Sequence, residues 1–265
     1  MSSANPSRVT FAVAFLMAVG LGSSCVQAAD SPIFGSPLED VGLYFTAPLR
    51  WDEEDWLYFG GALAAIGASH LLDSRTRAHF ATGSNAILNG EDKNSLRDSL
   101  PTVAIIAATG TGALLLRDSD GYRETWSLLE AGILGTASGE ILTYAAGRER
   151  PDATTSPNQW RQGGDSFPSL HADAAFAVGT VFAESGSDEY RWLRRIVGYG
   201  IATATAYIRV RENVHWVSDS VAGAALGIAT ARFVLDRRST ENREAALQFQ
   251  PIKGGWMVSY ATHIE

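Results

Sequence analysis

Histidines, arginines and an aspartate gather in three short blocks in the second half of the chain, at residues 147–151, 167–171 and 209–219. Arginine guanidinium groups stay charged and can bind phosphate oxygens through two parallel hydrogen bonds. Histidine exchanges a proton near neutral pH more readily than other side chains. These residue types therefore predict a site that holds a phosphate group and transfers it without a metal ion.

The third block pairs His215 with Asp219, four residues later. On a helix the two side chains would share a face, so the carboxylate would fix the imidazole tautomer and raise its basicity. A histidine activated in this way can act as a nucleophile. We expect both residues to open a helix after a loop that ends at Asn213, the predicted N-cap.

The second block has the pattern of another helix start. Pro168 suits the first turn of a helix that begins near Ser166, because the missing N–H of proline is not needed there. The N–H groups of Ser169 and Leu170 would then point out of the helix end and form an anion site. His171 lies on the same turn, where it could reach the oxygen that leaves.

In this order, the three blocks resemble the motifs of the type 2 phosphatidic acid phosphatase superfamily. That superfamily also contains bacterial acid phosphatases and vanadium haloperoxidases. The resemblance covers about residues 100–235. The matching positions are Thr143 with Arg150-Pro151, then Pro168-Ser169-Leu170-His171, then Ile208-Arg209 with His215 and Asp219.

The resemblance implies an all-α fold, a six-helix bundle of this superfamily's kind, and a phosphatase reaction. His215 would attack phosphorus and His171 would protonate the leaving group. Arg150, Arg209 and Ser169 match the residues that bind the phosphate. A metal ion is not expected, because the neighbouring arginines would repel a cation, and no other cofactor is implied.

Three positions depart from the superfamily's motifs. Thr143 replaces a lysine, and Arg148 could supply the missing charge. Leu170 replaces a glycine, so its side chain would narrow the phosphate pocket and restrict the backbone. Ile208 replaces a serine beside Arg209. We expect the chemistry to be retained with an altered phosphate affinity.

Other interpretations of the same residues stay open from the sequence alone. His215 and Asp219 could form a structural pair or bind a metal ion, and Arg148 or Arg211 could serve packing or face solvent. A vanadate-dependent haloperoxidase would use the same residues, with His215 bound to vanadate. A non-catalytic scaffold could have kept the fold after losing the lysine, glycine and serine.

The chain divides into four predicted segments. Residues 1–28 have the layout of a secretory signal peptide, and residues 29–55 are expected to be coil because of their prolines and glycines. Residues 56–238 would form the helical domain, and residues 239–265 a tail with a β-hairpin. The six predicted helices lie at residues 56–72, 101–116, 125–146, 169–184, 190–208 and 214–235.

The net charge and the length of the apolar runs limit which molecules and surfaces the protein can bind. The net charge of −8 argues against nucleic acid and against an anionic membrane surface. The apolar runs reach only about 12 to 18 residues, short of the roughly 20 that a membrane span needs. We therefore expect an exported protein, soluble or in peripheral contact with a membrane, that acts on a phosphorylated small molecule or lipid. An integral membrane protein remains the alternative.

Overall fold

Helices make up most of the described part of the chain in the computed structural model. The structure describes residues 37–81, 95–116, 118–186, 188–245, 247–252 and 255–260. The predicted signal peptide, residues 1–28, lies outside these described residues. The described residues all belong to one unit, Ser36–Glu265.

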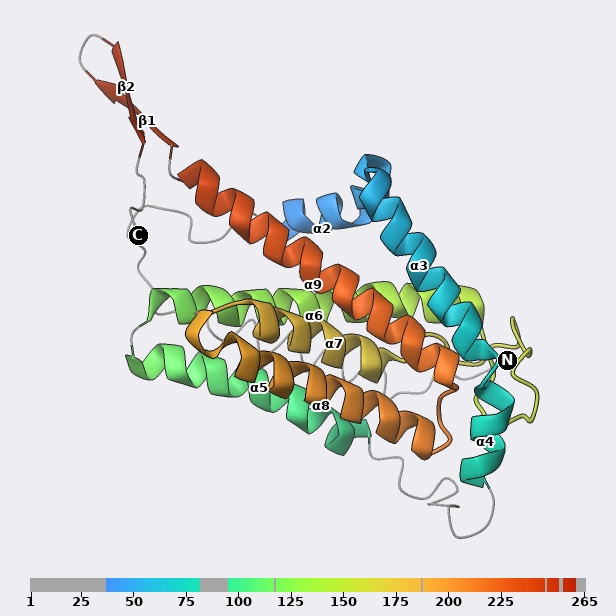
Figure 1. The fold of residues 1–265 in the computed structure, drawn as a ribbon. Helices are drawn as coiled ribbons and strands as arrows, with labels where there is room; N and C mark the ends of the chain where they lie inside the picture. The colour runs from blue at the N-terminus through green and yellow to red at the C-terminus, as the bar shows by residue number, and fades with distance from the viewer. Residues whose placement is uncertain are drawn as a thin grey trace. The chain divides into compact units, whose positions relative to one another are not determined.

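Eight α-helices occur in the described residues (Figure 1). They are α2 (Pro37–Thr46), α3 (Glu53–His70), α4 (Asp73–Ala81), α5 (Ser95–Leu116), α6 (Ser119–Ala146), α7 (Leu170–Glu184), α8 (Arg191–Arg211) and α9 (Val217–Ala245). Two short 3-10 helices are also present, η1 (Ala47–Arg50) and η3 (Asp188–Tyr190). Strands β1 (Leu247–Ile252) and β2 (Gly255–Tyr260) pair antiparallel.

This mostly helical structure confirms the predicted all-α class, with differences in detail. The six predicted stretches overlap α3 and α5 to α9, whereas the sequence does not predict α2 or α4. The prediction of coil over residues 29–55 is wrong for residues 37–50. Pro37 is the first residue of α2, a position where proline is tolerated because its missing N–H has no helical partner. Helix α9 also continues to Ala245, past the predicted boundary at residue 238.

Helix α7 lies at the centre of the bundle, in contact with α5, α6, α8 and α9 (Figure 1). Buried apolar side chains from α6, α7 and α9, among them Leu128, Val178, Val181 and Val234, form the core. Burial of such side chains is the main favourable term in folding. The packing of α7 therefore fixes the loops at its two ends.

Glycine lets α9 approach the first turn of α7 closely. A Cβ atom on Gly223 would lie 2.4 Å from the carbonyl oxygen of Ser169, far inside contact distance. A Cβ atom on Gly227 would lie 2.3 Å from the carbonyl oxygen of Asp173. Larger residues would push the helices apart, so these two glycines set the spacing between the second and third sequence blocks.

Two of the described helices are long and apolar enough to cross a membrane, by length and composition alone. The qualifying windows are Ser99–Leu116 of α5 and Val217–Ser239 of α9. At 18 and 23 residues, they are as long as or longer than the apolar runs expected from the sequence. Core helices of soluble proteins pass the same test, and 50% of the α9 window is buried inside the bundle.

Candidate active site

The three sequence blocks meet at one end of the bundle, where α6 and α8 end and α7 and α9 begin (Figure 1). Hydrogen bonds join them directly. The N–H of Ser169 donates to the carbonyl oxygen of Asp219 at 3.0 Å, and the indole N–H of Trp216 donates to the carbonyl oxygen of Glu149 at 2.8 Å. Residues far apart in the sequence therefore share one site.

His215 lies in the loop before α9, not on the helix. Its side chain is 3% exposed, and its Nδ1 atom lies 2.7 Å from the carbonyl oxygen of Ser166. A carbonyl can only accept a hydrogen bond, so Nδ1 carries the proton and Nε2 keeps its lone pair. The prediction that His215 and Asp219 share a helical face is wrong, because α9 begins two residues after His215.

Asp219 lies in the first turn of α9, and its carboxylate accepts hydrogen bonds from groups other than the imidazole of His215. Its Oδ2 atom is 3.8 Å from Nδ1 of His215, too long for a hydrogen bond. The carboxylate accepts from the N–H of Trp216 at 2.9 Å, from the hydroxyl of Ser166 and from Arg148. Burial raises the pKa of Asp219 to about 7, although these donors oppose the shift.

The imidazole of His215 is held in its neutral form. Burial lowers its pKa well below 6.5, and the positive charges of Arg150 and Arg209 lower it further. The backbone hydrogen bond to Ser166 and the charge of Asp152 act in the opposite direction. Since both arginines act on His215, the structure brings together the nucleophile candidate and two of the predicted phosphate-binding residues.

The two arginines are positioned in different ways. Arg150 forms a bidentate ion pair with Asp165, with Nε to Oδ1 at 2.7 Å and Nη2 to Oδ2 at 3.1 Å. Arg209 is 2% exposed in the last turn of α8, where Nη1 lies 3.3 Å from Glu212. The sequence places Arg209 in a loop, but α8 continues to Arg211.

Helix α7 begins later than expected, at Leu170, and Ser169 is its N-cap. The hydroxyl of Ser169 accepts from the N–H of Ala172 at 3.5 Å. Its own N–H donates to Asp219, so the prediction that this N–H points out to bind an anion is wrong. Ser169 therefore ties the start of α7 to the start of α9.

The side chain of Leu170, which the sequence predicts to narrow the phosphate pocket, packs against α6. A Cβ atom on Gly139 of α6 would lie 2.6 Å from Cδ2 of Leu170. The glycine on α6 thus provides the space for the leucine that replaces the motif glycine. His171 follows on the first turn of α7 and is half-buried.

Thr143 lies in the last turn of α6, just before the first block. The residue is 5% exposed, and its hydroxyl has no hydrogen-bond partner among the described residues. Gly147 ends α6 in a left-handed conformation, with φ of 52°, that glycine adopts without strain. This turn directs the chain into the first block.

Arg148 has protein partners at the place where the sequence left open either a phosphate contact or a role in packing. It is fully buried, and its guanidinium donates to Asp73, Asp219, Ser218 and the carbonyl oxygen of Pro157. Its Cζ atom also lies 4.5 Å and 5.3 Å from the ring centroids of Trp160 and Trp216. These contacts favour the structural role for Arg148 over the predicted replacement of the motif lysine.

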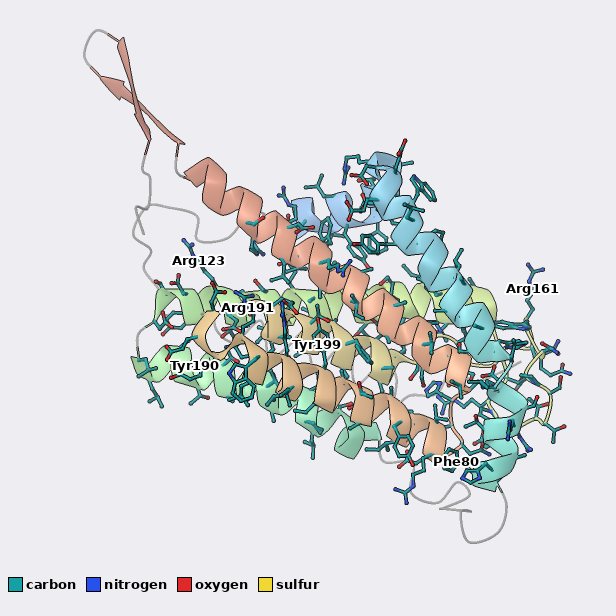
Figure 2. The ribbon with its side chains drawn as sticks, in the orientation of Figure 1. Phe80, Arg123, Arg161, Tyr190, Arg191 and Tyr199 are labelled. Atoms are coloured by element: carbon teal, nitrogen blue, oxygen red, sulfur yellow. The ribbon has the colours of Figure 1, made fainter. Side chains whose placement is uncertain are left out.

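Helix α4, which the sequence does not predict, also reaches this end of the bundle. Nε of Arg77 donates to the carbonyl oxygens of Pro151 and Thr154 at 2.8 and 3.0 Å. Figure 2 shows Phe80 of α4 and Arg161 of the loop after α6 at this same end. Residues of α4 and of the first and third blocks, among them Asp73, Pro151 and His215, surround a narrow gap that has no room for a water molecule.

Sequence reasoning missed the site residues Asp73, Asp165, Ser166 and Ser218. Asp165 and Ser166 directly precede the second block, which is a usable signal. Asp73 is 75 residues from its partner Arg148, and no pattern in the sequence connects them. Groups of three His, Cys, Asp or Glu side chains suited to a metal ion do not occur within the described ranges.

Comparisons with known proteins point to one family. The sequence model of the PAP2 superfamily matches residues 124–243, which contain all three blocks. The chain is 32% identical over 196 residues to a lipid A 1-phosphatase of Porphyromonas gingivalis, covering 71% of this chain and 39% of that protein. The chain therefore spans less than half of the length of this relative.

Among solved structures, a transmembrane PAP2-type phosphatidylglycerolphosphate phosphatase from Bacillus subtilis is similar. It is 19% identical, with a TM-score of 0.38, and the comparison covers 88% of this chain and 96% of that one. A TM-score at this level does not establish a shared fold. On the match of the family model and the three motifs within it, the chain belongs to the PAP2 superfamily.

Proposed function

We propose that the protein is a phosphatase that hydrolyses a phosphomonoester or a pyrophosphate through a phosphohistidine intermediate on His215. The observation that carries this proposal is the hydrogen bond of 2.7 Å from Nδ1 of His215 to the carbonyl oxygen of Ser166. It leaves Nε2 unprotonated in a buried site, under the influence of the positive charges of Arg150 and Arg209. A neutral imidazole beside fixed cations is what attack on a phosphate requires.

In this mechanism the phosphate oxygens bind to Arg150 and Arg209. Nε2 of His215 forms a bond to phosphorus while the bond to the leaving oxygen breaks. His171 donates a proton to that oxygen as general acid. A water molecule then attacks the phosphohistidine, His171 takes its proton, and the bond between nitrogen and phosphorus breaks to release inorganic phosphate. No step needs a metal ion or another cofactor.

We further propose a lipid-linked phosphate as the substrate class. The 32% identical relative is named a lipid A 1-phosphatase, and two described helices are apolar enough to contact a bilayer. We also propose that the protein is exported from the cytoplasm and contacts a membrane. A panel of lipid phosphates, isoprenoid pyrophosphates and soluble phosphomonoesters would identify the leaving group.

The decisive experiment is phosphate labelling of the enzyme with a radioactive phosphomonoester. His171→Ala, combined with a good leaving group such as 4-nitrophenolate that departs without a proton, should accumulate a label that is stable to base and labile to acid, because the variant lacks the base that activates water. His215→Asn should give no label and lose several orders of magnitude in turnover. His79→Asn, at an exposed histidine of α4, is the matched control and should keep full activity.

Equal labelling of the His215 and His171 variants would contradict the assignment of the nucleophile. Oxidation of bromide by added hydrogen peroxide, catalysed by the vanadate-loaded protein without phosphate release, would instead identify a haloperoxidase. Phosphate binding with neither reaction would identify a non-catalytic scaffold.

A further inference from the structure

Arg148 lies between two buried carboxylates, Asp73 of α4 and Asp219 of α9. Nη2 donates to Oδ2 of Asp73 at 2.7 Å, and Nη1 donates to Oδ1 of Asp219. The side chains of all three residues have no exposed area. Because charges buried in this way are stable only when paired, each of the three depends on the others.

Asp73 also holds the first turn of α9 directly. Its Oδ1 atom accepts from the N–H of Ser218 at 2.9 Å, and its Oδ2 atom accepts from the hydroxyl of Ser218 at 2.6 Å. The same hydroxyl accepts from Nη1 of Arg148 at 2.8 Å. Ser218 is the neighbour of Asp219, so one carboxylate binds both the backbone of this turn and the arginine that pairs with Asp219.

We infer that Asp73 is a positioning residue of the site: it anchors Arg148 and the first turn of α9, and so holds the Asp219 carboxylate in place. This inference rests on the proposed phosphatase function. Asp73 lies outside residues 124–243, the range that the family model matches. The α3–α4 region, which lies outside the three motifs, thus supplies a group on which the site depends.

The geometry explains why a residue without substrate contact would affect turnover. Asp219 lies 3.8 Å from the imidazole of His215 and also accepts from the N–H of Trp216, the residue after His215. A shift of the first turn of α9 would therefore move the carboxylate and the loop that carries His215 together. Small displacements of reacting groups cost large factors in rate. We expect phosphate binding to change less, because Asp73 pairs with Arg148 and not with the phosphate-binding candidates Arg150 and Arg209.

The test compares two conservative variants of buried carboxylates. Asp73→Asn keeps the shape of the side chain but removes the charge that binds Arg148. We expect kcat on a soluble aryl phosphate to fall about 10- to 100-fold, the range for groups that orient site residues, with KM changed less than about threefold. The matched control is Asp40→Asn, because Asp40 is also buried and arginine-bound but lies on α2. It should keep kcat within about twofold of the parent protein.

A double variant separates positioning from a general loss of stability. If Asp73 acts through Asp219, Asp73→Asn combined with Asp219→Asn should have the kcat of Asp219→Asn alone. Multiplied losses, or an unchanged kcat in Asp73→Asn, would overturn the inference. If Asp73→Asn does not fold, Ser218→Ala is tested instead, because it removes only the hydroxyl that joins α9 to Asp73 and Arg148. Ser218→Ala should lower kcat without raising KM. An unchanged kcat in this variant would also overturn the inference.

A second readout does not depend on turnover. The imidazole ¹⁵N signals of His215 should shift in Asp73→Asn and stay unchanged in Asp40→Asn. If the parent protein hydrolyses no phosphate, the proposed function fails, yet this shift still tests the link from Asp73 to the site. Unchanged His215 signals in folded Asp73→Asn would overturn the inference whatever the activity.

Discussion

The imidazole of His215 donates its Nδ1 proton to the backbone carbonyl oxygen of Ser166, at 2.7 Å. A main-chain group, not the carboxylate of Asp219, therefore selects the tautomer. Side-chain substitution at position 166 leaves this acceptor in place. The reactive state of His215 thus depends on the path of the backbone just before α7, which several other contacts fix.

The pH dependence of activity should reflect the lowered pKa of His215. A nucleophilic imidazole must be neutral, and burial together with Arg150 and Arg209 lowers its pKa well below 6.5. The protonated form therefore appears only at lower pH, and the acid limb of kcat/KM against pH should lie below 6.5. An NMR titration of the His215 ring in the free protein checks this directly. A midpoint at or above 6.5 would contradict the predicted shift.

Replacement of Arg148 should lower the free energy of unfolding, because this arginine is buried between two carboxylates. Arg148→Met leaves the buried carboxylates of Asp73 and Asp219 without their cation, a change that costs about 3–5 kcal/mol in other proteins. Chemical denaturation measures this loss. Arg211→Met, at an exposed arginine of α8, is the control and should change stability by less than about 0.5 kcal/mol. Similar midpoints for the two variants would argue against the structural role of Arg148.

The buried carboxyl of Asp173 should make stability depend on pH. Neither oxygen has a hydrogen-bond partner in the described residues, and burial raises the pKa of Asp173 well above 3.8. The stability contributed by this group is fully present below pH 3.8 and is lost as pH rises toward the folded-state pKa. The loss amounts to at most about 1.4 kcal/mol per pH unit.

Asp173→Asn tests this dependence, because asparagine has nearly the same shape and cannot ionise. Denaturation curves of both proteins are compared across pH. Other titrating groups, such as Asp219 and His215, contribute to both proteins alike, so the difference isolates Asp173. The variant should gain stability over the parent protein as pH rises above 3.8. A difference that does not change with pH would show that Asp173 titrates normally.

Gly139→Ala should destabilise the contact between α6 and α7. The new Cβ would lie 2.6 Å from Cδ2 of Leu170 and 2.9 Å from Oδ2 of Asp173. Overpacking of this kind costs about 1–3 kcal/mol. Gly61→Ala on α3 is the control, since nothing lies within 4 Å of its added Cβ, and it should stabilise by about 0.5–1 kcal/mol. Thermal unfolding compares the two, and equal effects would contradict the predicted clash.

Residue types and spacing predict which residues come together at this site better than they predict how those residues are arranged. The convergence of the three blocks follows from their reactive residues, and the helices follow from long apolar stretches rich in small residues. The position of His215 before α9 does not follow, because it depends on a local turn. Asn213 has φ of 58° there, and the carbonyl oxygen of Arg209 accepts from two later N–H groups.

The role of Arg148 shows a second limit of sequence reasoning. An arginine beside a phosphate-binding motif has the same charge whether it binds substrate or a buried carboxylate. Its partner Asp73 is 75 residues away in an unpredicted helix, so spacing carries no information about the pair. Only the packing of α4 against the loops distinguishes the two roles.

The carbonyl oxygen of Arg209 accepts from the N–H groups of Val214 and His215, both at 3.3 Å. The end of α8 therefore carries a phosphate-binding candidate on its side chain and the nucleophile candidate on its main chain. A sliding or rotation of α8 would move the Arg209 guanidinium and, through these two hydrogen bonds, pull on the loop that carries His215. Phosphate binding and nucleophilic attack would therefore be disturbed together by a change at the end of this one helix.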